Sequence, residues 1–292
     1  GETHSIKGGP PIVTDVTIKG SEMTLDMRES GPQVVEFVNS PISNTYSSIQ
    51  VALLTSVGKK IEKQYRNAGC FRSVKVLTKR GTIVHSLLPA TQGNSTNFVA
   101  KQIIEVTWHA LSKAIPQDTP AGWSPIAPWV FSGTDPRRNE GYGAPDFLGC
   151  SNGAGAIWGT DGWPAALCAI ASGQCWLPEI EVCESTYPIN WIRWELAIDS
   201  SGAGRWRGGI GAYNVWVVDA GKEPVYIAEQ GDPYHYDVVP NPLGGKIPSH
   251  NVKTVTFKTG DVKNYDDIDR DKFYVLHSGD KIEYYCSGGA GV

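Results

Sequence analysis

The sequence contains no apolar run long enough to cross a membrane as a helix. Its first residues also lack the charged-then-apolar pattern of a secretory signal. It has no basic run, and its formal net charge is −4, so we expect neither a membrane nor a nucleic acid as a partner. The six cysteines form no Cys-x-x-Cys pair, which disfavours a zinc site. Reduced thiols in a cytoplasmic protein are therefore the expectation.

Motifs that would identify a self-sufficient enzyme are also missing. A phosphate-binding loop needs Gly-Lys-Ser or Gly-Lys-Thr before a helix, and neither occurs. The Gly-x-Ser-x-Gly turn that presents a serine nucleophile is absent too. His85 and His109 have no second ligand at metal-binding spacing, and we expect His235 to lie in an exposed loop. The sequence thus assigns no catalytic residue, no nucleotide site and no metal ligand to this chain alone.

The composition indicates a well-packed, strand-rich protein with many turns. Of 292 residues, 40% are hydrophobic, and there are 33 glycines, 19 prolines, 10 tryptophans and 12 tyrosines. Such a chain can bury a sizeable core. No repeat and no linker divides it, so we treat residues 1–292 as one module. The predicted fold class is α+β, rich in strands and with a few packed helices.

Periodicity predicts the main elements of the first 120 residues. Three short strands are expected within Val13–Val38, the last of them at Gln33–Val38, and another strand at Ser73–Thr78. One helix is expected to begin with Asn44 as its N-cap and to stop near Gly58. A second is expected to be capped within Gly93–Thr96 and to end at Pro116.

The following stretch is rich in proline and glycine and predicts an irregular segment from Pro120 to Pro145. Aromatic residues on such a segment often bury against a partner, so we expect that role for Trp123, Trp129 and Phe131.

A group of three carboxylates, Glu179, Glu181 and Glu184, precedes the alternating strand Trp191–Ile198. Placed on an extended segment, Glu179 and Glu181 would share a face and suit acid–base work. Solvation, or pairing with an arginine such as Arg193, is the structural alternative.

Asp199–Ala212 is the most unusual stretch, because five glycines and two arginines crowd into fourteen residues between two predicted strands. Glycine is needed where φ is positive or where backbones approach closely, and we expect Gly204 and Gly208 to adopt conformations that a Cβ disfavours. The amides of such a turn can form an anion-binding nest, to which Arg205 and Arg207 would add charge. A rigid packing loop remains the alternative.

A second glycine-rich loop, Cys150–Ala156, is followed by Asp161-Gly162. Its backbone amides could line a pocket. From the two loops together, Asn152, Asp161, Arg205 and Arg207 are the candidates for residues that face a substrate or a phosphate.

The order of several blocks resembles the C-terminal half of the hydantoinase B/oxoprolinase family. The resemblance covers nearly the whole chain, and the block from Asp199 is highly specific. The blocks are Leu25-Asp26 with Gly31-Pro32-Gln33-Val34 and Asn39, Asn67–Phe71, Gly93-Asn94 leading to Ala110-Leu111, Glu181 and Glu184 before Tyr187-Pro188, Asp199–Gly211, and Ser287–Gly291.

Within that family, the loop Cys150–Ala156 with Asp161-Gly162 looks most like the B-type (alpha or alpha-prime) subunit of ATP-dependent acetone and acetophenone carboxylases. The resemblance implies a subunit of a cytoplasmic hetero-oligomer that converts a ketone and bicarbonate to a β-keto acid. ATP would be handled by a sugar-kinase-like partner, and a divalent metal by a hydantoinase B-like N-terminal subunit. The alternatives are an ATP-dependent hydantoinase or oxoprolinase that opens a cyclic amide, and a non-catalytic scaffold subunit.

Overall fold

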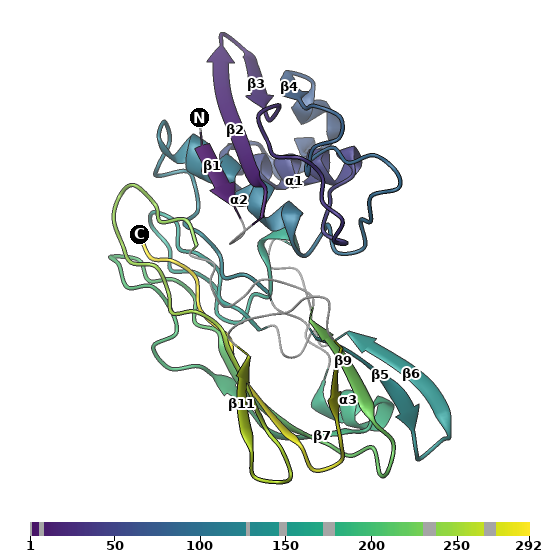
Figure 1. The fold of residues 1–292 in the computed structure, drawn as a ribbon. Coiled ribbons are helices and arrows are strands. Elements are labelled where there is room, and N and C mark those ends of the chain that lie inside the picture. The colour runs from purple at the N-terminus through teal and green to yellow at the C-terminus, as the bar shows by residue number, and fades with distance from the viewer. Residues whose placement is uncertain are drawn as a thin grey trace.

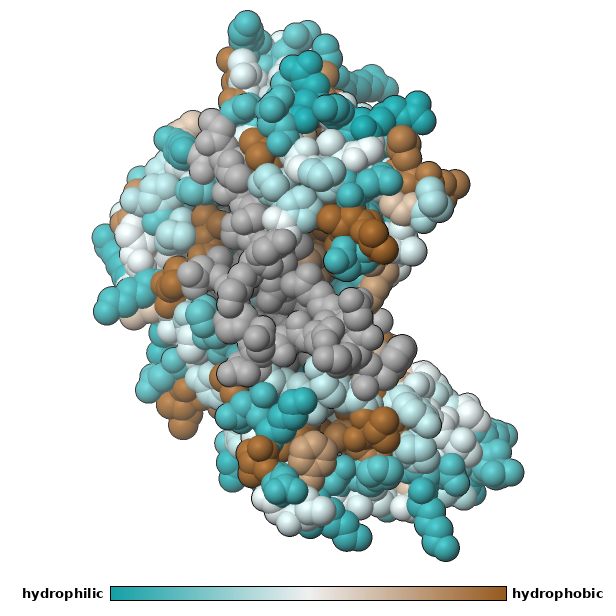
Figure 2. All heavy atoms as spheres, viewed as in Figure 1, coloured by the Kyte–Doolittle hydropathy of each residue, from teal (hydrophilic) through white to brown (hydrophobic). Residues whose placement is uncertain are grey.

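The computed structural model describes residues 2–5, 9–126, 129–145, 151–171, 179–229, 238–265 and 273–292. Within them the chain forms three sheets and three α-helices, which confirms the α+β class (Figure 1). An N-terminal lobe of one sheet and two helices lies at the top of Figure 1, and two further sheets lie at the bottom. Apolar residues on the visible face occur as separate patches among polar ones (Figure 2).

The N-terminal lobe is built on a sheet with the order β1-β2-β3-β4, in which β3 and β4 are parallel and the other pairs antiparallel. The strands are β1 (Glu2–Ser5), β2 (Pro11–Lys19), β3 (Glu22–Asp26) and β4 (Val74–Leu77). The strand expected at Gln33–Val38 is wrong. Buried Asn39 explains why, because its side chain bonds both the N–H and the C=O of Val34, each at 2.8 Å. A β-ladder would have used those backbone groups.

Two helices cover this sheet, α1 (Ile42–Thr55) and α2 (Val99–Ser112). Both were predicted in place, but the expected caps are wrong, since neither helix has a side-chain N-cap bond. Pro41 precedes α1, and its fixed φ suits a helix start. Asn44 therefore falls in the first turn, where its Nδ2 donates to Ser40 Oγ at 2.8 Å. The lobe's core includes Ile12, Leu25, Ile49, Leu53, Phe98, Ile103 and Val106.

The two lower sheets pack face to face. One has the order β11-β10-β13-β8-β7 and the other β12-β9-β5-β6, with every neighbouring pair antiparallel. Both contribute to one core of aromatic and branched residues. The bounds are β5 (Trp129–Asp135), β6 (Glu140–Pro145), β7 (Ile189–Leu196), β8 (Ala212–Val218), β9 (Val225–Glu229), β10 (Val252–Thr256), β11 (Val262–Tyr265), β12 (Phe273–Leu276) and β13 (Lys281–Tyr285).

The hairpin β5–β6 corrects the expectation of an irregular segment up to Pro145. Its aromatic residues are buried inside this chain: the rings of Phe131 and Trp216 meet edge to face at 4.7 Å, and Trp129 packs edge-on to Tyr265 at 5.3 Å. Trp123 is buried as well, against Trp108 of α2. The expectation that Trp123, Trp129 and Phe131 are reserved for a partner is therefore wrong.

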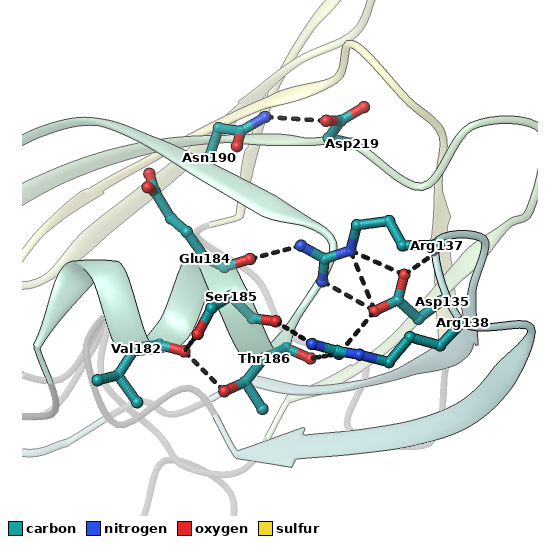
Figure 3. Close-up of polar contacts among 9 residues, drawn as sticks. All are labelled: Asp135, Arg137, Arg138, Val182, Glu184, Ser185, Thr186, Asn190 and Asp219. Atoms are coloured by element: carbon teal, nitrogen blue, oxygen red, sulfur yellow. Dashed lines mark hydrogen bonds and ion pairs between the residues drawn. The ribbon is translucent and has the colours of Figure 1, made fainter.

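The carboxylates expected just before a strand lie instead around a short helix, α3 (Ile180–Thr186), which leads into β7. Two arginines after β5 hold its C-terminal end (Figure 3): Arg137 Nη1 donates to the Glu184 carbonyl and Arg138 Nη2 to the Ser185 carbonyl, both at 2.6 Å. Buried Asp135 receives both guanidinium groups. Hydrogen bonds from Arg137 hold the pKa of Asp135 below its ordinary value. Side-chain bonds thus join α3 to the β5–β6 hairpin.

Candidate functional site

Four extended segments form what we call the glycine bundle: residues 121–124, 151–163, 200–211 and 286–292. They run side by side at the left of Figure 1 and lie outside the three sheets. Gly153 N–H donates to Ser287 O, Ala154 N–H to Trp163 O, and Ala156 N–H to Ala290 O, at 2.9–3.1 Å. The Ala154 carbonyl accepts from Gly209 N–H at 2.8 Å. Residues 151–156 thus have more than two hydrogen-bonded neighbours, which a strand in a flat sheet cannot have.

Close packing of backbones explains the glycines of the bundle. A Cβ on Gly208 would overlap the carbonyl of Gly289, and a Cβ on Gly153 would overlap the carbonyl of Gly209. All of residues 200–211 are described, and none of their glycines has a positive φ, so a Cβ is disfavoured at Gly204 and Gly208 by the close approach of other backbone and not by φ. The bundle uses glycine as collagen does, to remove side chains from a crowded axis.

Asn152, the first of the predicted site residues, belongs to a buried polar cluster. Its Nδ2 donates to Ser124 Oγ at 2.8 Å and to Asn251 Oδ1 at 2.7 Å. Asn251 Oδ1 also accepts from Ser287 N–H at 2.8 Å, and the hydroxyls of Ser124 and Ser287 share a hydrogen bond. All four residues are at most 2% exposed. The cluster ties three bundle segments to the residue just before β10.

Asp161 and Arg207 meet at the surface edge of the bundle. The Arg207 N–H donates to Asp161 Oδ1 at 2.8 Å, and the Gly162 N–H donates to the Arg207 carbonyl at 2.8 Å. Both side chains are exposed. Among the described residues, no hydrogen bond or ion pair engages the Arg207 guanidinium. The carboxylate therefore fixes the backbone of Arg207 and leaves its side chain available.

Arg205 lies on two tryptophan rings that the sequence did not single out. Its Cζ is 4.8 Å from the ring centroid of Trp206 and 5.5 Å from that of Trp158, distances typical of cation–π contacts. The two rings contact each other at 4.3 Å. Trp158 and Trp206 are close in sequence to the glycines of the bundle. That position was the sequence signal by which they could have been identified. The structure thus brings Asp161, Arg205 and Arg207 to one exposed edge and buries Asn152.

A second group of charged residues lies where α2 meets the bundle. Lys101 Nζ and Glu105 Oε2 are 3.0 Å apart and almost fully buried, and Glu105 Oε1 accepts from the Trp123 N–H at 3.0 Å. Burial lowers the pKa of His109, one turn further along, against the opposing effect of Glu105. Lys101 and Glu105 are spaced i, i+4, and that spacing was the available signal for the pair.

Among the described residues, no group of three or more His, Cys, Asp or Glu side chains is placed to hold a metal ion. His235, Cys150 and Cys175 lie outside the described residues. The expectation that the metal belongs to a partner remains a prediction. No helix in the described ranges is long and apolar enough to cross a membrane.

Comparison with known proteins identifies the family. The hydantoinase B/oxoprolinase profile matches residues 2–292, so the chain belongs to the hydantoinase B/oxoprolinase family. It is 33% identical over 202 residues to the beta subunit of the caprolactamase of Pseudomonas jessenii, covering 68% of this chain and 34% of the relative. It is 31% identical over 211 residues to the B-type subunit of a putative D-/L-hydantoinase of Pseudomonas sp. (strain NS671), covering 69% and 33%. The chain thus spans about a third of the length of these curated relatives.

Two solved structures share the fold. An ATP-dependent caprolactamase from Pseudomonas jessenii superposes with a TM-score of 0.80 at 23% identity, over 99% of this chain and 50% of that one. A nucleotide-free acetone carboxylase superposes with a TM-score of 0.80 at 16% identity, over 97% of this chain and 41% of that one. The fold therefore occurs in both a caprolactamase and an acetone carboxylase.

Proposed function

We propose that this chain is the C-terminal part of the B-type component of an ATP-dependent enzyme that opens a cyclic amide. The observation that carries the proposal is its identity of 33% to a caprolactamase subunit and 31% to a putative hydantoinase subunit. Both names specify cleavage of an amide bond inside a ring. Such a bond is stabilised by resonance, and coupling to ATP offers a way to activate its carbonyl.

A second candidate is the ATP-dependent carboxylation of a ketone with bicarbonate to give a β-keto acid. The superposition on acetone carboxylase over 97% of the chain supports it, as does the resemblance of the loop that contains Asn152 and Asp161. Under both candidates, a cytoplasmic hetero-oligomer would carry out the reaction. A sugar-kinase-like partner would bind ATP, and the metal would sit on a hydantoinase B-like N-terminal region, outside the residues described here.

In either reaction the charged edge of the glycine bundle would face an anionic group. Arg207 is the principal candidate, because its backbone is held by Asp161 while its guanidinium makes no hydrogen bond or ion pair with a described residue. A guanidinium presents a planar pair of donors to a phosphate or carboxylate. Arg205 would contribute charge from its place on Trp158 and Trp206. Asn152 would act indirectly, because its buried cluster fixes segment 151–163, which carries Asp161.

The test is ATP turnover by the complex assembled from this chain, the ATP-binding partner and the metal-carrying region. We expect turnover with a lactam or a hydantoin, and none with a ketone and bicarbonate. The reverse preference would replace the first candidate by the second. Turnover that is the same with and without this chain would leave only a scaffold role.

The variant Arg207→Lys tests the assignment of the charged edge. Lysine keeps the charge and loses the planar fork, so we expect turnover to fall about tenfold or more while the complex still assembles. Arg80→Lys is the matched control, because Arg80 is exposed on the N-terminal lobe, away from the bundle. Unchanged turnover in Arg207→Lys would show that the Asp199–Ala212 segment serves packing and does not recognise an anion through Arg207.

A further inference from the structure

Strand β7 is an edge strand whose first half is capped by α3, where the Trp191 N–H donates to Glu184 Oε1 at 2.6 Å, and whose second half is open among the described residues. It is the last strand of the order β11-β10-β13-β8-β7, and residues 192–196 are all exposed. Its apolar side chains are among them: Trp194 is 37% exposed and Leu196 43%. An exposed apolar edge strand is a template for pairing with another chain, and proteins usually protect such edges.

The backbone of β7 is oriented for such pairing. Ala197 N–H donates to Gly211 O at 2.8 Å, on the side of β8. In an antiparallel pair the N–H and C=O of one residue point to the same side, and successive residues alternate. Trp194 and Leu196 therefore present their backbone groups to the open edge. The irregularity between Trp191 and Arg193 limits the regular part to the residues that follow it.

The charges on the other face of β7 specify which strand fits this edge. Arg193 Nη1 lies 3.4 Å from Glu195 Oε1, and both side chains are 54% exposed. When an identical strand runs antiparallel with Trp194 opposite itself, Arg193 of each copy lies opposite Glu195 of the other. In this register the Trp194 residues of the two copies form a hydrogen-bonded pair. The backbone N–H and C=O of Trp194 point to the open edge, so they are placed to make these bonds. Shifting the partner strand to the next register with the same hydrogen-bonding pattern places Arg193 opposite Arg193 in one direction and Glu195 opposite Glu195 in the other. Both registers are unfavourable because like charges face each other.

We propose that β7 is a self-complementary interface through which two copies of this chain associate about a twofold axis at Trp194. The two sheets then continue into one another across the axis. Apolar residues meet on one face and two Arg193–Glu195 pairs form on the other. The interface is isologous, as twofold dimers require. It is independent of the catalytic proposal, because it needs no substrate, nucleotide or other subunit.

The test is the mass of the purified chain in solution, by light scattering or sedimentation, over about a hundredfold range of concentration. We expect the wild type to approach twice the monomer mass at the higher concentrations. Arg193→Glu alone and Glu195→Arg alone each bring like charges together twice, and each is expected to weaken dimerisation about tenfold or more. An equimolar mixture of the two variants restores both opposite-charge pairs and is expected to dimerise again.

Lys281→Glu is the matched control. Lys281 forms a comparable pair with Glu283 at 3.1 Å on β13, a central strand of the same sheet. We expect this variant to dimerise like the wild type. The proposal is overturned if the wild type stays monomeric throughout, if the two single variants dimerise normally, if their mixture stays monomeric, or if Lys281→Glu abolishes dimerisation as well.

Discussion

The N-terminal lobe and the glycine bundle are stabilised in opposite ways. In the lobe, side chains such as Leu25, Ile49 and Ile103 fill the space between a sheet and two helices, each contributing roughly 1.5–3 kcal/mol by burial. In the bundle, backbones touch one another, and a Cβ at Gly208 or Gly153 would overlap a neighbouring carbonyl. Close-packed backbone hydrogen bonds therefore supply most of the contacts between bundle segments, and the buried apolar side chains there are mostly small, such as Ala121, Ala156 and Ala290.

This difference determines what each region tolerates. A side-chain core can be repacked, because neighbouring rotamers adjust to a change of one methyl group. Adjacent backbones cannot adjust without breaking the hydrogen bonds that hold them. The bundle therefore suits a surface that must keep its shape, such as the edge that carries Asp161, Arg205 and Arg207.

The largest expected effect comes from adding one methyl group to the bundle. Gly208→Ala places a Cβ against the carbonyl of Gly289, and backbone is on both sides of the contact. We expect the free energy of unfolding to fall by about 3 kcal/mol or more, measured by denaturant titration. Gly143→Ala is the control, because Gly143 lies in β6 with open space around it and should change little. Equal effects at the two positions would contradict close packing at Gly208.

An intermediate effect is expected where side-chain charges hold an element. Asp135→Asn removes the charge that receives Arg137 and Arg138, and we expect a loss of about 1–2 kcal/mol, moderated by the exposure of both arginines. Because the pKa of Asp135 is lowered in the folded state, its contribution is complete above the unfolded pKa of about 3.9. That contribution is lost as the pH falls through the folded pKa. Stability curves of the two proteins should therefore converge in acid. A constant difference down to the lowest pH would show that the charge is not responsible.

The smallest effect is expected from removing one methyl group from the lobe. Ile103→Val leaves a small gap among residues that can shift, and we expect a loss of about 1 kcal/mol by denaturant titration. Compared with Gly208→Ala, the change in size is similar and the cost is smaller. A larger loss in Ile103→Val than in Gly208→Ala would reverse the proposed contrast between the regions.

Sequence reasoning succeeded where local pattern decides the structure. The hydrophobic periodicity of residues 99–112 predicted α2, and alternation predicted β4 and β7. It failed where distant residues decide. Asn39 takes up the backbone of Val34 and prevents a strand there. The stretch Trp129–Pro145 reads as irregular because of its glycines, yet pairing with β9 makes it a hairpin.

The candidate site shows the same limit. The density of glycine marked Asp199–Ala212 as special, and Arg205 and Arg207 do lie at an exposed edge together with Asp161. Sequence alone could not separate positive φ from close approach, because the carbonyls that crowd Gly208 belong to residues about eighty positions away. The burial of Asn152 beside Ser124 and Asn251 depends on residues 28 and 99 positions away in the sequence.

Hydrogen exchange of the bundle amides tests the central claim most directly. The N–H groups of Gly153, Ala156, Gly209 and Gly289 belong to no helix or sheet, yet each donates to a backbone carbonyl of another segment at 2.8–3.1 Å. We predict that they exchange as slowly as the paired amides of β8, through global unfolding. Exchange at the rate of exposed loops, with β8 still protected, would contradict a bundle held together by its backbone.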